Sequence, residues 1–403
     1  MQSSERTEKR PTLRLRVTST AEWKVRSGHP WVFADSIKSQ NRGGEVGELA
    51  IVYDKWDNFL AVGLFDPYSP LRVRVLHAGK PQTIDDAWWR ERFVNALTLR
   101  HGLFDDATTG YRCIHGENDG WPALVLDRFG DTAVLKLYSA VWFGRVEQIV
   151  TLIREHAKVQ RLVVRLSRNI QRDAKAGTVS DGAVLFGAPV ESPVLFRENG
   201  LVFEADVLKG QKTGFFLDQR ENRMKVGELA KGRSVLNTFS FSGGFSVHAA
   251  RGGAASVTDV DISAHALAAA ERNFSHNSAA TENCRHELVK ADAFDWLKHA
   301  RAKYGVVVLD PPSLAKKESD RKNALEAYAR LASLGIERVQ PGGVLVAASC
   351  SAHIAGEEFF AIVRTAARKS GRSFSELAIT GHAADHPAKF AEAVYLKCIF
   401  LQF

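Results

Sequence analysis

The stretch over residues 234–263 constrains the fold of this chain most. An apolar strand pattern leads into a small-residue turn holding Gly243 and Gly244, then an Ala-rich helical pattern, then a second strand that ends at Asp261. This order predicts a β-α-β unit whose glycines let the backbone approach a ligand. The carboxylate lies 17 residues after Gly244, near the spacing at which nucleotide-binding folds place a ribose-binding acid. The turn lacks the G-x-G-x-x-G spacing, which disfavours a dinucleotide, and a plain α/β core unit would give the same pattern.

The chain from residue 203 onward alternates strand and helix patterns. Strands are predicted in VLNTFS, SVTDVD, HELVKAD, VVVLDPPS and GVLVAAS, with helices of about ten to fifteen residues between them and a further strand in AVYLKCIFLQF. This predicts a parallel sheet with right-handed crossovers, whose ligands lie beyond the carboxyl ends of the strands. The polar residues expected at those ends are Ser240, Asp261, Asp292, Asp310 and Cys350.

A chain of 403 residues is long enough for two or three domains. We expect a basic arm over residues 1–11 within a small β-rich domain over 1–80, an α+β domain over 81–195, and the sheet domain over 196–403. A helix is predicted near the start of the central domain. The residues expected along its buried face are Trp88, Phe93, Leu97 and Leu99.

The formal net charge of +8 favours polyanionic partners, because each Lys or Arg that meets a phosphate releases condensed counterions. Residues 1–80 carry 13 Lys and Arg against 9 Asp and Glu, interleaved with aromatic residues. Such a surface can follow a phosphate backbone and stack bases. Alternatively, the aromatic residues fill a small core while strand arginines alternate outward. The side chains concerned are Trp23, Trp31, Phe33 and Trp56, and Arg14, Arg16, Arg72 and Arg74.

No apolar run reaches 18 residues and the first residues are charged, so we expect a cytoplasmic protein without a membrane span. The four cysteines are far apart and show no C-x-x-C spacing, which argues against a zinc site and a disulfide framework. We therefore expect no metal. The sequence leaves the oligomeric state open, with a homodimer as one option.

The candidate ligand residues suit a nucleoside cofactor without phosphates. Asp261 could bind ribose and Asp292, followed by Ala293, could flank an adenine, while no phosphate-binding Lys-Ser/Thr pair follows the glycines. S-adenosylmethionine is the obvious candidate. Asp310 precedes two prolines that restrict the backbone, and Cys350 follows the next strand pattern. If these strands are neighbours, about 4.8 Å apart, one pyrimidine could contact both residues.

Cytosine methylation would give such a pair a purpose. Carbon 5 of cytosine is a poor nucleophile, but a thiolate that adds at carbon 6 produces an enamine whose carbon 5 can attack a methyl group. Asp310 at the N3 edge would stabilise the charge if burial raises its pKa. A buried thiol without a catalytic role is the alternative for Cys350, but its predicted place beside a ligand favours the nucleophile. The other cysteines, Cys113, Cys284 and Cys398, are read as structural.

Five motifs, in order and spacing, resemble the RlmI-type family of ribosomal RNA large-subunit cytosine-C5 methyltransferases. They are KTGFFLDQRENR, NTFSFSGGFSVHA, VTDVDIS, VLDPPS and AASCSAH. GHPWVF at residues 28–33 resembles the start of a PUA domain, and YRCIHGENDGWPALVLDRFGD extends the similarity through the centre. The resemblance implies an α/β protein with an N-terminal PUA-like β-barrel, a small central α+β domain and a C-terminal Rossmann-like class I methyltransferase sheet. It also implies S-adenosyl-L-methionine as methyl donor and large-subunit ribosomal RNA as partner.

The resemblance further implies a role for each site residue. Cys350 would be the nucleophile and Asp310 would face the target base. Asp261 would hold the ribose, Asp292 the adenine side, and residues 237–244 the methionine end. The implied cofactor-binding residues are Asn237, Phe239, Ser240, Gly243, Gly244, Asp261, Ile262, Asp292, Ala293 and Asp310.

Three questions stay open. Ser313 follows the DPP motif where some RNA cytosine methyltransferases have a second cysteine, so the base that removes the carbon 5 proton could be Asp310, Ser313 or a water. A related branch with a similar DPP motif methylates guanine and lacks the thiol that Cys350 supplies here. An RNA-binding assembly factor with a degenerate cofactor fold is the non-enzymatic alternative.

Overall fold

The computed structural model describes residues 11–174, 179–191 and 193–403, so the expected basic arm lies, except for Pro11, outside the described residues. The chain divides into two compact units. The first comprises Met1–His101, Cys113–Asp127 and Asp131–Pro189, and the second comprises Gly102–Arg112, Arg128–Gly130 and Val190–Phe403. In the described part of the chain, no helix is both long and apolar enough to cross a membrane.

The described N-terminal residues form a six-stranded sheet in the order β2-β6-β5-β4-β1-β3. Its elements are β1 (Leu13–Val17), α1 (Ser19–Arg26), β2 (Trp31–Phe33), β3 (Ile37–Gln40), β4 (Leu49–Tyr53), β5 (Phe59–Phe65) and β6 (Leu71–Ala78). The four strands predicted from alternating apolar residues, β1, β4, β5 and β6, are confirmed. The core is largely aliphatic, with Leu13, Leu15 and Val52 almost fully buried.

The alternative in which the N-terminal aromatics fill this core is wrong for three of them, one being Phe33 at 36% exposure. Trp23 is 69% exposed and Trp56 is 73% exposed. Trp23 lies on α1, and Trp56 lies in the turn between β4 and β5. The branched aliphatic residues on the inner strand faces already fill the small interior, so these indoles remain on the surface.

The central sheet has the order β11-β10-β9-β8-β7 in the described chain. Its elements are α2 (Asp86–Thr98), β7 (Gly110–His115), β8 (Leu124–Phe129), β9 (Thr132–Leu137), α3 (Val146–His156), β10 (Arg161–Leu166) and β11 (Val184–Phe186). Trp88 and Phe93 of α2 are buried as predicted. The placement of Leu99 on that buried face is wrong, because the helix ends at Thr98 and Leu99 is 56% exposed.

The C-terminal sheet of the described chain has the order β16-β15-β14-β17-β18-β20-β19. Its strands are β14 (Ser234–Thr238), β15 (Ser256–Asp261), β16 (Arg285–Lys290), β17 (Tyr304–Leu309), β18 (Val339–Ser349), β19 (Ser375–Thr380) and β20 (Lys397–Gln402). The first five run parallel as predicted. The predicted terminal strand is β20, which lies antiparallel between β18 and the edge strand β19. Sequence patterns missed β19, whose largely exposed residues give little apolar signal.

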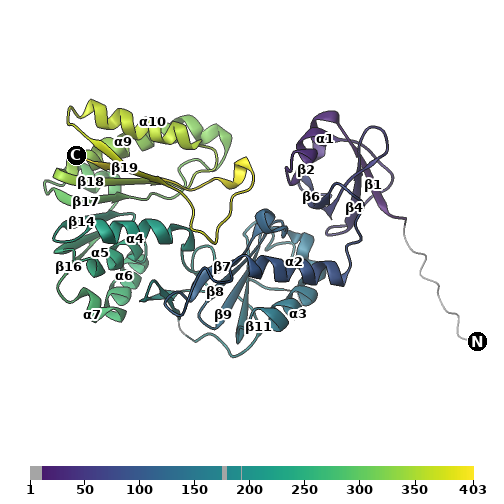
Figure 1. The fold of residues 1–403 in the computed structure, drawn as a ribbon, viewed down its shortest axis with the longest axis horizontal. Helices are drawn as coiled ribbons and strands as arrows, with labels where there is room; N and C mark the ends of the chain where they lie inside the picture. The colour runs from purple at the N-terminus through teal and green to yellow at the C-terminus, as the bar shows by residue number, and fades with distance from the viewer. Residues whose placement is uncertain (1–10, 175–178, 192) are drawn as a thin grey trace, which may run out of the picture. The chain divides into compact units, whose positions relative to one another are not determined.

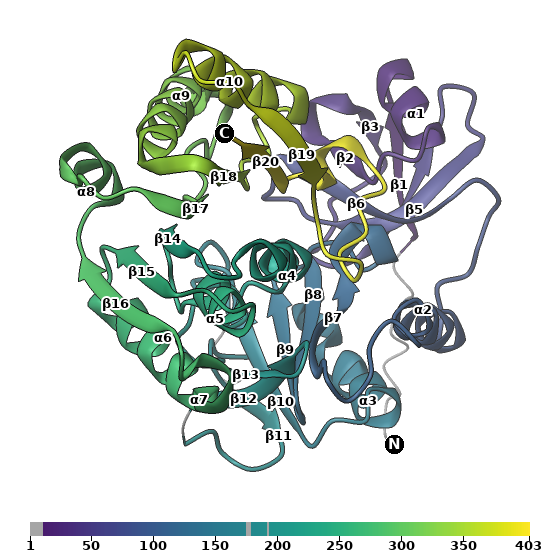
Figure 2. The same cartoon turned by 60° about the vertical axis from the view of Figure 1, so that its left-hand side comes forward.

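Helices cover both faces of this sheet (Figures 1 and 2). On one face lie α5 (Gly244–Arg251) and α6 (Ala264–His276), and on the other lie α9 (Arg321–Arg338) and α10 (Gly356–Lys369). The predicted helix length of about ten to fifteen residues is wrong for α5, for α9 with 18 residues and for α8 (Ala293–His299) with 7. A two-stranded ribbon, β12 (Val194–Glu198) and β13 (Leu201–Ala205), and helices α4 (Arg220–Leu229) and α7 (Ser278–Thr281) complete this unit.

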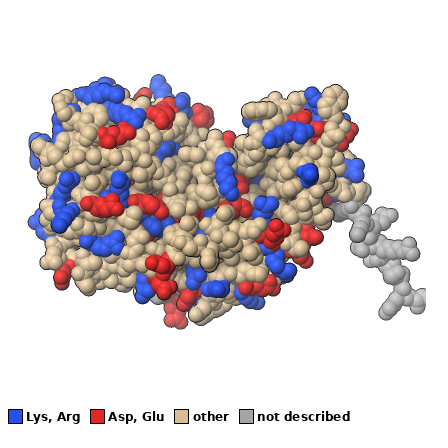
Figure 3. Space-filling view, in the orientation of Figure 1, with Lys and Arg blue, Asp and Glu red and all other residues tan. Residues whose placement is uncertain are grey.

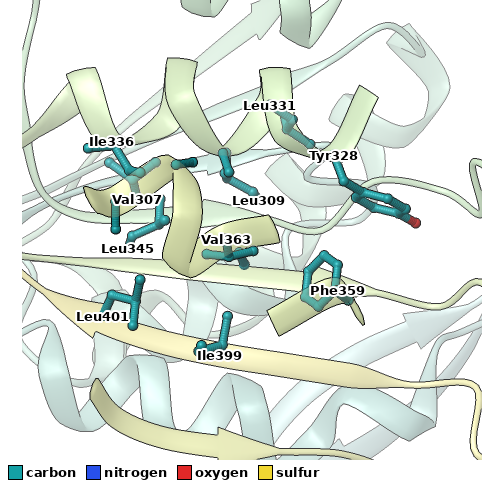
Figure 4. Packing of buried hydrophobic residues seen from close by; sticks show 14 of the residues in the cluster. Val307, Leu309, Tyr328, Leu331, Ile336, Leu345, Phe359, Val363, Ile399 and Leu401 are labelled. Atoms are coloured by element: carbon teal, nitrogen blue, oxygen red, sulfur yellow. The ribbon is translucent and has the colours of Figure 1, made fainter. Parts of the chain in front are cut away.

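A buried apolar layer joins the sheet to α9 and α10 (Figure 4). Val307, Leu309 and Leu345 project from the strands to meet Leu331 of α9 and Val363 of α10. Each such side chain contributes about 1.5–3 kcal/mol through burial.

The strand order reverses direction at β14, since β15 and β16 lie on one side of it and β17 and β18 on the other. This is the position where open α/β sheets bind ligands.

Candidate functional site

The polar residues predicted at the strand ends are where the sequence placed them. Asp261 ends β15, and Asp292, Asp310 and Cys350 follow β16, β17 and β18. Ser240 lies in the turn after β14, at the reversal of strand order. Because these strands run parallel, their carboxyl ends lie together, and these residues share one edge of the sheet.

The turn between β14 and α5 has an unusual backbone. Phe239 and Phe241 have φ angles of 56° and 48°, and Gly243 has a φ of 72°. A bulky residue in this left-handed region costs about 1–3 kcal/mol, and such residues cluster at ligand sites. A Cβ on Gly243 would lie 2.9 Å from the Cβ of Ala270, so a side chain there would clash with α6.

This turn also leaves polar atoms buried without partners. The hydroxyls of Ser240 and Ser242 and the Oδ1 of Asn237 make no hydrogen bond. The Nδ2 of Asn237 donates to the Oδ1 of Asp259 at 2.8 Å, which fixes its amide. Buried polar atoms in folded proteins are nearly always satisfied, so these three are suited to a polar ligand or water. This is the stretch assigned to the methionine end of the cofactor.

Asp261 is anchored by backbone amides. Its Oδ2 accepts a hydrogen bond from the N–H of Phe241 at 2.9 Å, and its Oδ1 accepts one from the N–H of Ser263 at 2.8 Å. A carboxylate offers about four acceptor positions, so the fixed group retains capacity for two ribose hydroxyls. The next residue, Ile262, is 69% exposed, which leaves an apolar side chain available for a flat ring.

Asp292 has a structural role that sequence reasoning missed. Its Oδ1 accepts a hydrogen bond from the N–H of Asp295 at 3.0 Å, which makes Asp292 the N-cap of α8. The signal was present, because an Asp that directly precedes a helical pattern is a preferred N-cap. Asp292 is exposed and Ala293 is buried. A capping role leaves the second carboxylate oxygen available to a ligand.

Asp310 lies at the end of a chain of hydrogen-bonded side chains. The Nε2 of Gln219 donates to the Oδ1 of Asp310 at 2.9 Å, and the Oε1 of Gln219 accepts from the Nδ2 of Asn222 at 2.6 Å. Asn222 in turn accepts from the hydroxyl of Thr380 at 2.5 Å. Burial, followed by the nearby Asp218, raises the pKa of Asp310 to about 7. The carboxyl group can therefore hold or release a proton near neutral pH.

Cys350 lies beside the DPP segment. Its thiol donates to the carbonyl oxygen of Pro311 at a sulfur-to-oxygen distance of 4.0 Å. Burial, followed by the charge of Asp310, raises the pKa of the Cys350 thiol to about 11, while Lys212 and Lys397 oppose this rise. The resting group is thus a thiol, and it must lose its proton during any nucleophilic attack.

Of the other cysteines, Cys398 lies near this edge, since it pairs with Ala348, and burial followed by the charge of Asp310 raises the pKa of its thiol. Cys398 is fully buried on β20 and Cys113 is buried on β7, while Cys284 lies just before β16, at the opposite end of that strand. Burial raises the pKa of the Cys284 thiol to about 11. The structural role expected for these three cysteines stays a prediction.

Lys397 is a site residue that sequence reasoning missed. It is 2% exposed, and its Nζ donates to the carbonyl oxygens of Ser351 at 2.6 Å and Ile354 at 2.7 Å. Burial lowers its pKa to about 8. The lysine inside the apolar run YLKCIF was a usable signal, because a charged residue in a buried strand needs specific partners.

The hydroxyl of Ser313, one of the candidates for removal of the carbon 5 proton, is already engaged. It donates to the carbonyl oxygen of Ala315 at 3.0 Å and pairs with the hydroxyl of Ser351 at 3.1 Å. The pKa of Asp310, about 7, leaves that carboxyl able to hold or release a proton near neutral pH, whereas the Ser313 hydroxyl is held by these two partners.

Two family models match the chain. The chain matches a family model described as S-adenosylmethionine-dependent methyltransferase over residues 112–377, and a PUA-like domain model over residues 15–78.

Two relatives match almost end to end. A ribosomal RNA large subunit methyltransferase of Deinococcus radiodurans is 53% identical over 400 residues, covering 97% of this chain and 98% of the relative. A ribosomal RNA large subunit methyltransferase I of Shewanella frigidimarina is 33% identical, covering 96% and 98%.

Two solved structures share the fold. One is a candidate SAM-dependent methyltransferase from Streptococcus mutans, with a TM-score of 0.81, 23% identity and coverage of 97% of this chain and 100% of that one. The other is a candidate methyltransferase complexed with SAH, with a TM-score of 0.84, 24% identity and the same coverage.

Proposed function

The chain belongs to the S-adenosylmethionine-dependent methyltransferase family, and we propose that it methylates carbon 5 of a cytosine in large-subunit ribosomal RNA. S-adenosylmethionine is the methyl donor of the family. The names of its relatives, which match over nearly their whole length, support ribosomal RNA of the large subunit as the substrate.

One observation supports cytosine and a covalent route above all: the Cys350 thiol contacts Pro311, next to Asp310, on the neighbouring strand end. A thiol beside a carboxyl group of pKa about 7 is what addition to carbon 6 requires. A guanine methyltransferase would have no use for this thiol. A non-catalytic assembly factor would need neither the thiol nor the carboxyl group beside it, so the same contact also counts against that alternative.

The proposed reaction uses both groups. The Cys350 thiol passes its proton to a water as its sulfur bonds to carbon 6, while protonated Asp310 donates its own proton to N3 of the ring. S-adenosylmethionine, when bound, would supply the electrophilic methyl group for carbon 5, and its sulfur would keep the electron pair of the bond that breaks. A water then accepts the carbon 5 proton, Asp310 recovers the proton from N3, and the bond between sulfur and carbon 6 breaks with its electron pair returning to Cys350, which regains a proton from solvent. Splitting the substitution this way replaces one difficult step with easier ones.

The residues around β14 and β15 would hold the cofactor. We assign the ribose to Asp261, the adenine side to Ile262, Asp292 and Ala293, and the methionine end to the turn after β14. The unpartnered hydroxyls of Ser240 and Ser242 fit this polar end. The full set is Asn237, Phe239, Ser240, Gly243, Gly244, Asp261, Ile262, Asp292, Ala293 and Asp310.

The PUA-like domain would contact RNA through its exposed tryptophans. The Nζ of Lys55 lies 5.2 Å from the ring centre of Trp56, and the Arg26 guanidinium joins α1 to the adjacent turn through Asp54 at 3.0 Å. Exposed aromatic rings beside cations suit stacked bases and phosphates. Basic and acidic side chains are interspersed on the face that Figure 3 shows. We retain the division into domains over 1–80, 81–195 and 196–403 as part of this proposal.

Mass spectrometry of ribosomal RNA from cells with and without the gene tests the proposed function. We expect one 5-methylcytosine in the large-subunit RNA that is lost on deletion and restored by the gene. A methylated guanine lost in its place would favour the guanine branch. An unchanged RNA would overturn the assignment of this substrate.

A further inference from the structure

A buried tyrosine hydroxyl joins the two residues that flank Cys350. Tyr328 of α9 is 2% exposed, and its hydroxyl accepts a hydrogen bond from Ser349 at 2.9 Å. The same hydroxyl pairs with the hydroxyl of Ser351 at 2.9 Å. The side chains on both sides of the cysteine thus hydrogen-bond to α9, and this directs the thiol between them away from that helix. Its contact with Pro311 is consistent with that direction.

This hydroxyl cluster also reaches the loop that carries Asp310. The hydroxyl of Ser351 pairs with that of Ser313 at 3.1 Å and accepts from the N–H of Ala315 at 3.3 Å. Ser313 directly follows the two prolines after Asp310. A single network of hydroxyls therefore ties the loop after β17 to the loop after β18.

We propose that Tyr328 is a positioning residue, whose hydroxyl holds the loops of Cys350 and Asp310 at the separation that the reaction needs. This inference rests on the proposed function, since it assigns a role relative to Cys350 as nucleophile. Reactions between held groups are sensitive to geometry, and a displacement of about 1 Å can cost on the order of a hundredfold in rate.

The ring and the hydroxyl of Tyr328 have separable roles. The ring packs against Phe359 with ring centres 5.2 Å apart, and Figure 4 shows it at the end of the apolar cluster. Phenylalanine would keep this packing and remove only the hydroxyl. From the β20 side, Lys397 holds the backbone of the same loop through the carbonyl oxygens of Ser351 and Ile354. The loop would therefore stay folded in Tyr328→Phe while its side-chain anchor is lost.

The test compares Tyr328→Phe with Tyr304→Phe in the full chain. Tyr304 is also buried, at 8% exposure, and begins β17 at the end opposite to Asp310. Three quantities are measured for each: kcat and KM on large-subunit RNA from a strain lacking the gene, the affinity for SAH by calorimetry, and the alkylation rate of Cys350 by iodoacetamide against pH, followed by peptide mass spectrometry.

For Tyr328→Phe we expect kcat to fall on the order of ten- to a hundredfold. The KM and the SAH affinity should stay within about twofold, because neither depends on the thiol position. Cys350 should be alkylated faster and at lower pH, because a freed loop exposes the buried thiol. A more reactive thiol in a slower enzyme is a signature that lost stability alone does not give. Tyr304→Phe should change none of these.

Unchanged kcat and unchanged Cys350 alkylation in Tyr328→Phe would overturn the proposal. If that variant does not fold, Ser351→Ala removes one arm of the network and should show the same pair of effects, and its failure to do so would be equally decisive. The alkylation measurement needs no RNA. It therefore tests the positioning role even if the wild-type protein methylates no cytosine, an outcome that would reject the proposed function instead.

Discussion

The thiol of Cys350 lies 4.0 Å from the main-chain carbonyl oxygen of Pro311, although 39 positions separate the two residues along the chain. The contact follows from the pairing of β17 with β18, which aligns Leu309 with Ala347 and so brings the ends of both strands together. It places the proposed nucleophile beside the segment that carries Asp310.

Replacing the proposed nucleophile should stop catalysis without weakening cofactor binding. We expect Cys350→Ala to lower methyl transfer from labelled S-adenosylmethionine to RNA by at least about a thousandfold, since covalent activation is lost. Its SAH affinity, measured by calorimetry, should stay close to wild type. Cys284→Ala is the matched control, because that thiol has a similarly raised pKa but lies at the opposite end of the sheet. Undiminished turnover by Cys350→Ala would reject the covalent route.

The protonation of Asp310 should make stability depend on pH. Burial raises the pKa of this carboxyl from 3.8 to about 7, so the folded protein binds its proton more tightly than the unfolded chain does. The stabilisation is therefore complete below about pH 4 and is lost as the pH rises toward 7. Asp310→Asn cannot ionise and keeps an acceptor oxygen for Gln219.

Denaturant unfolding at several pH values measures this effect. Between pH 5 and pH 8 we expect Asp310→Asn to gain about 1–3 kcal/mol in the free energy of unfolding relative to wild type. Stability curves of wild type and variant that run parallel over this range would show that Asp310 ionises normally in the folded protein.

The strand ends could be predicted because each follows an apolar run, and a parallel sheet brings those ends to one edge. The positions of Asp261, Asp310 and Cys350 followed from this rule. Local patterns gave no access to the contacts of Tyr328, and they marked Lys397 as unusual without naming its partners, because those partners lie 21 and 46 residues away and depend on how α9 and β20 pack. The edge strand β19 escaped prediction because half-exposed residues carry little periodic signal.

The carboxylate of Asp261 should contribute to cofactor affinity. A hydrogen bond to a charged group contributes about 1.5–3 kcal/mol, so we expect Asp261→Ala to weaken binding of S-adenosylmethionine by about ten- to a hundredfold. Because Asp261 also anchors two backbone amides, Ser263→Ala serves as the control: it removes the cap of α6 but leaves the carboxylate in place. Equal calorimetric affinities for Asp261→Ala and wild type would exclude the ribose role.

The exposed tryptophans should contribute to RNA affinity without contributing to its salt dependence. Stacking of a base on an aromatic ring contributes about 1–3 kcal/mol, so Trp23→Ala and Trp56→Ala should each weaken RNA binding by about fivefold or more. Lys55→Ala should instead reduce the slope of affinity against salt by about one unit, as expected for a lost phosphate contact. Leu195→Ala is the control, as a half-exposed apolar residue outside this domain. Unchanged binding of an RNA fragment in fluorescence titrations of both tryptophan variants would place the RNA contact elsewhere.

The turn after β14 should require glycine at position 243 for two reasons, its positive φ angle and its close approach to α6. Gly232 has only the first of these features, so comparing the two glycines separates their effects. Both residues have positive φ angles, 72° and 70°, but a Cβ on Gly243 would lie 2.9 Å from Ala270 whereas one on Gly232 would meet nothing within 4 Å. Gly232→Ala should therefore lower the free energy of unfolding only by the backbone strain, about 1 kcal/mol. Gly243→Ala should lower it by about 1–3 kcal/mol more, because α6 must move to relieve the clash. Since that movement displaces the proposed cofactor turn, Gly243→Ala should also weaken SAH binding, while Gly232→Ala should not. Equal losses of stability and of affinity in the two variants would mean that contact with α6 does not shape this turn.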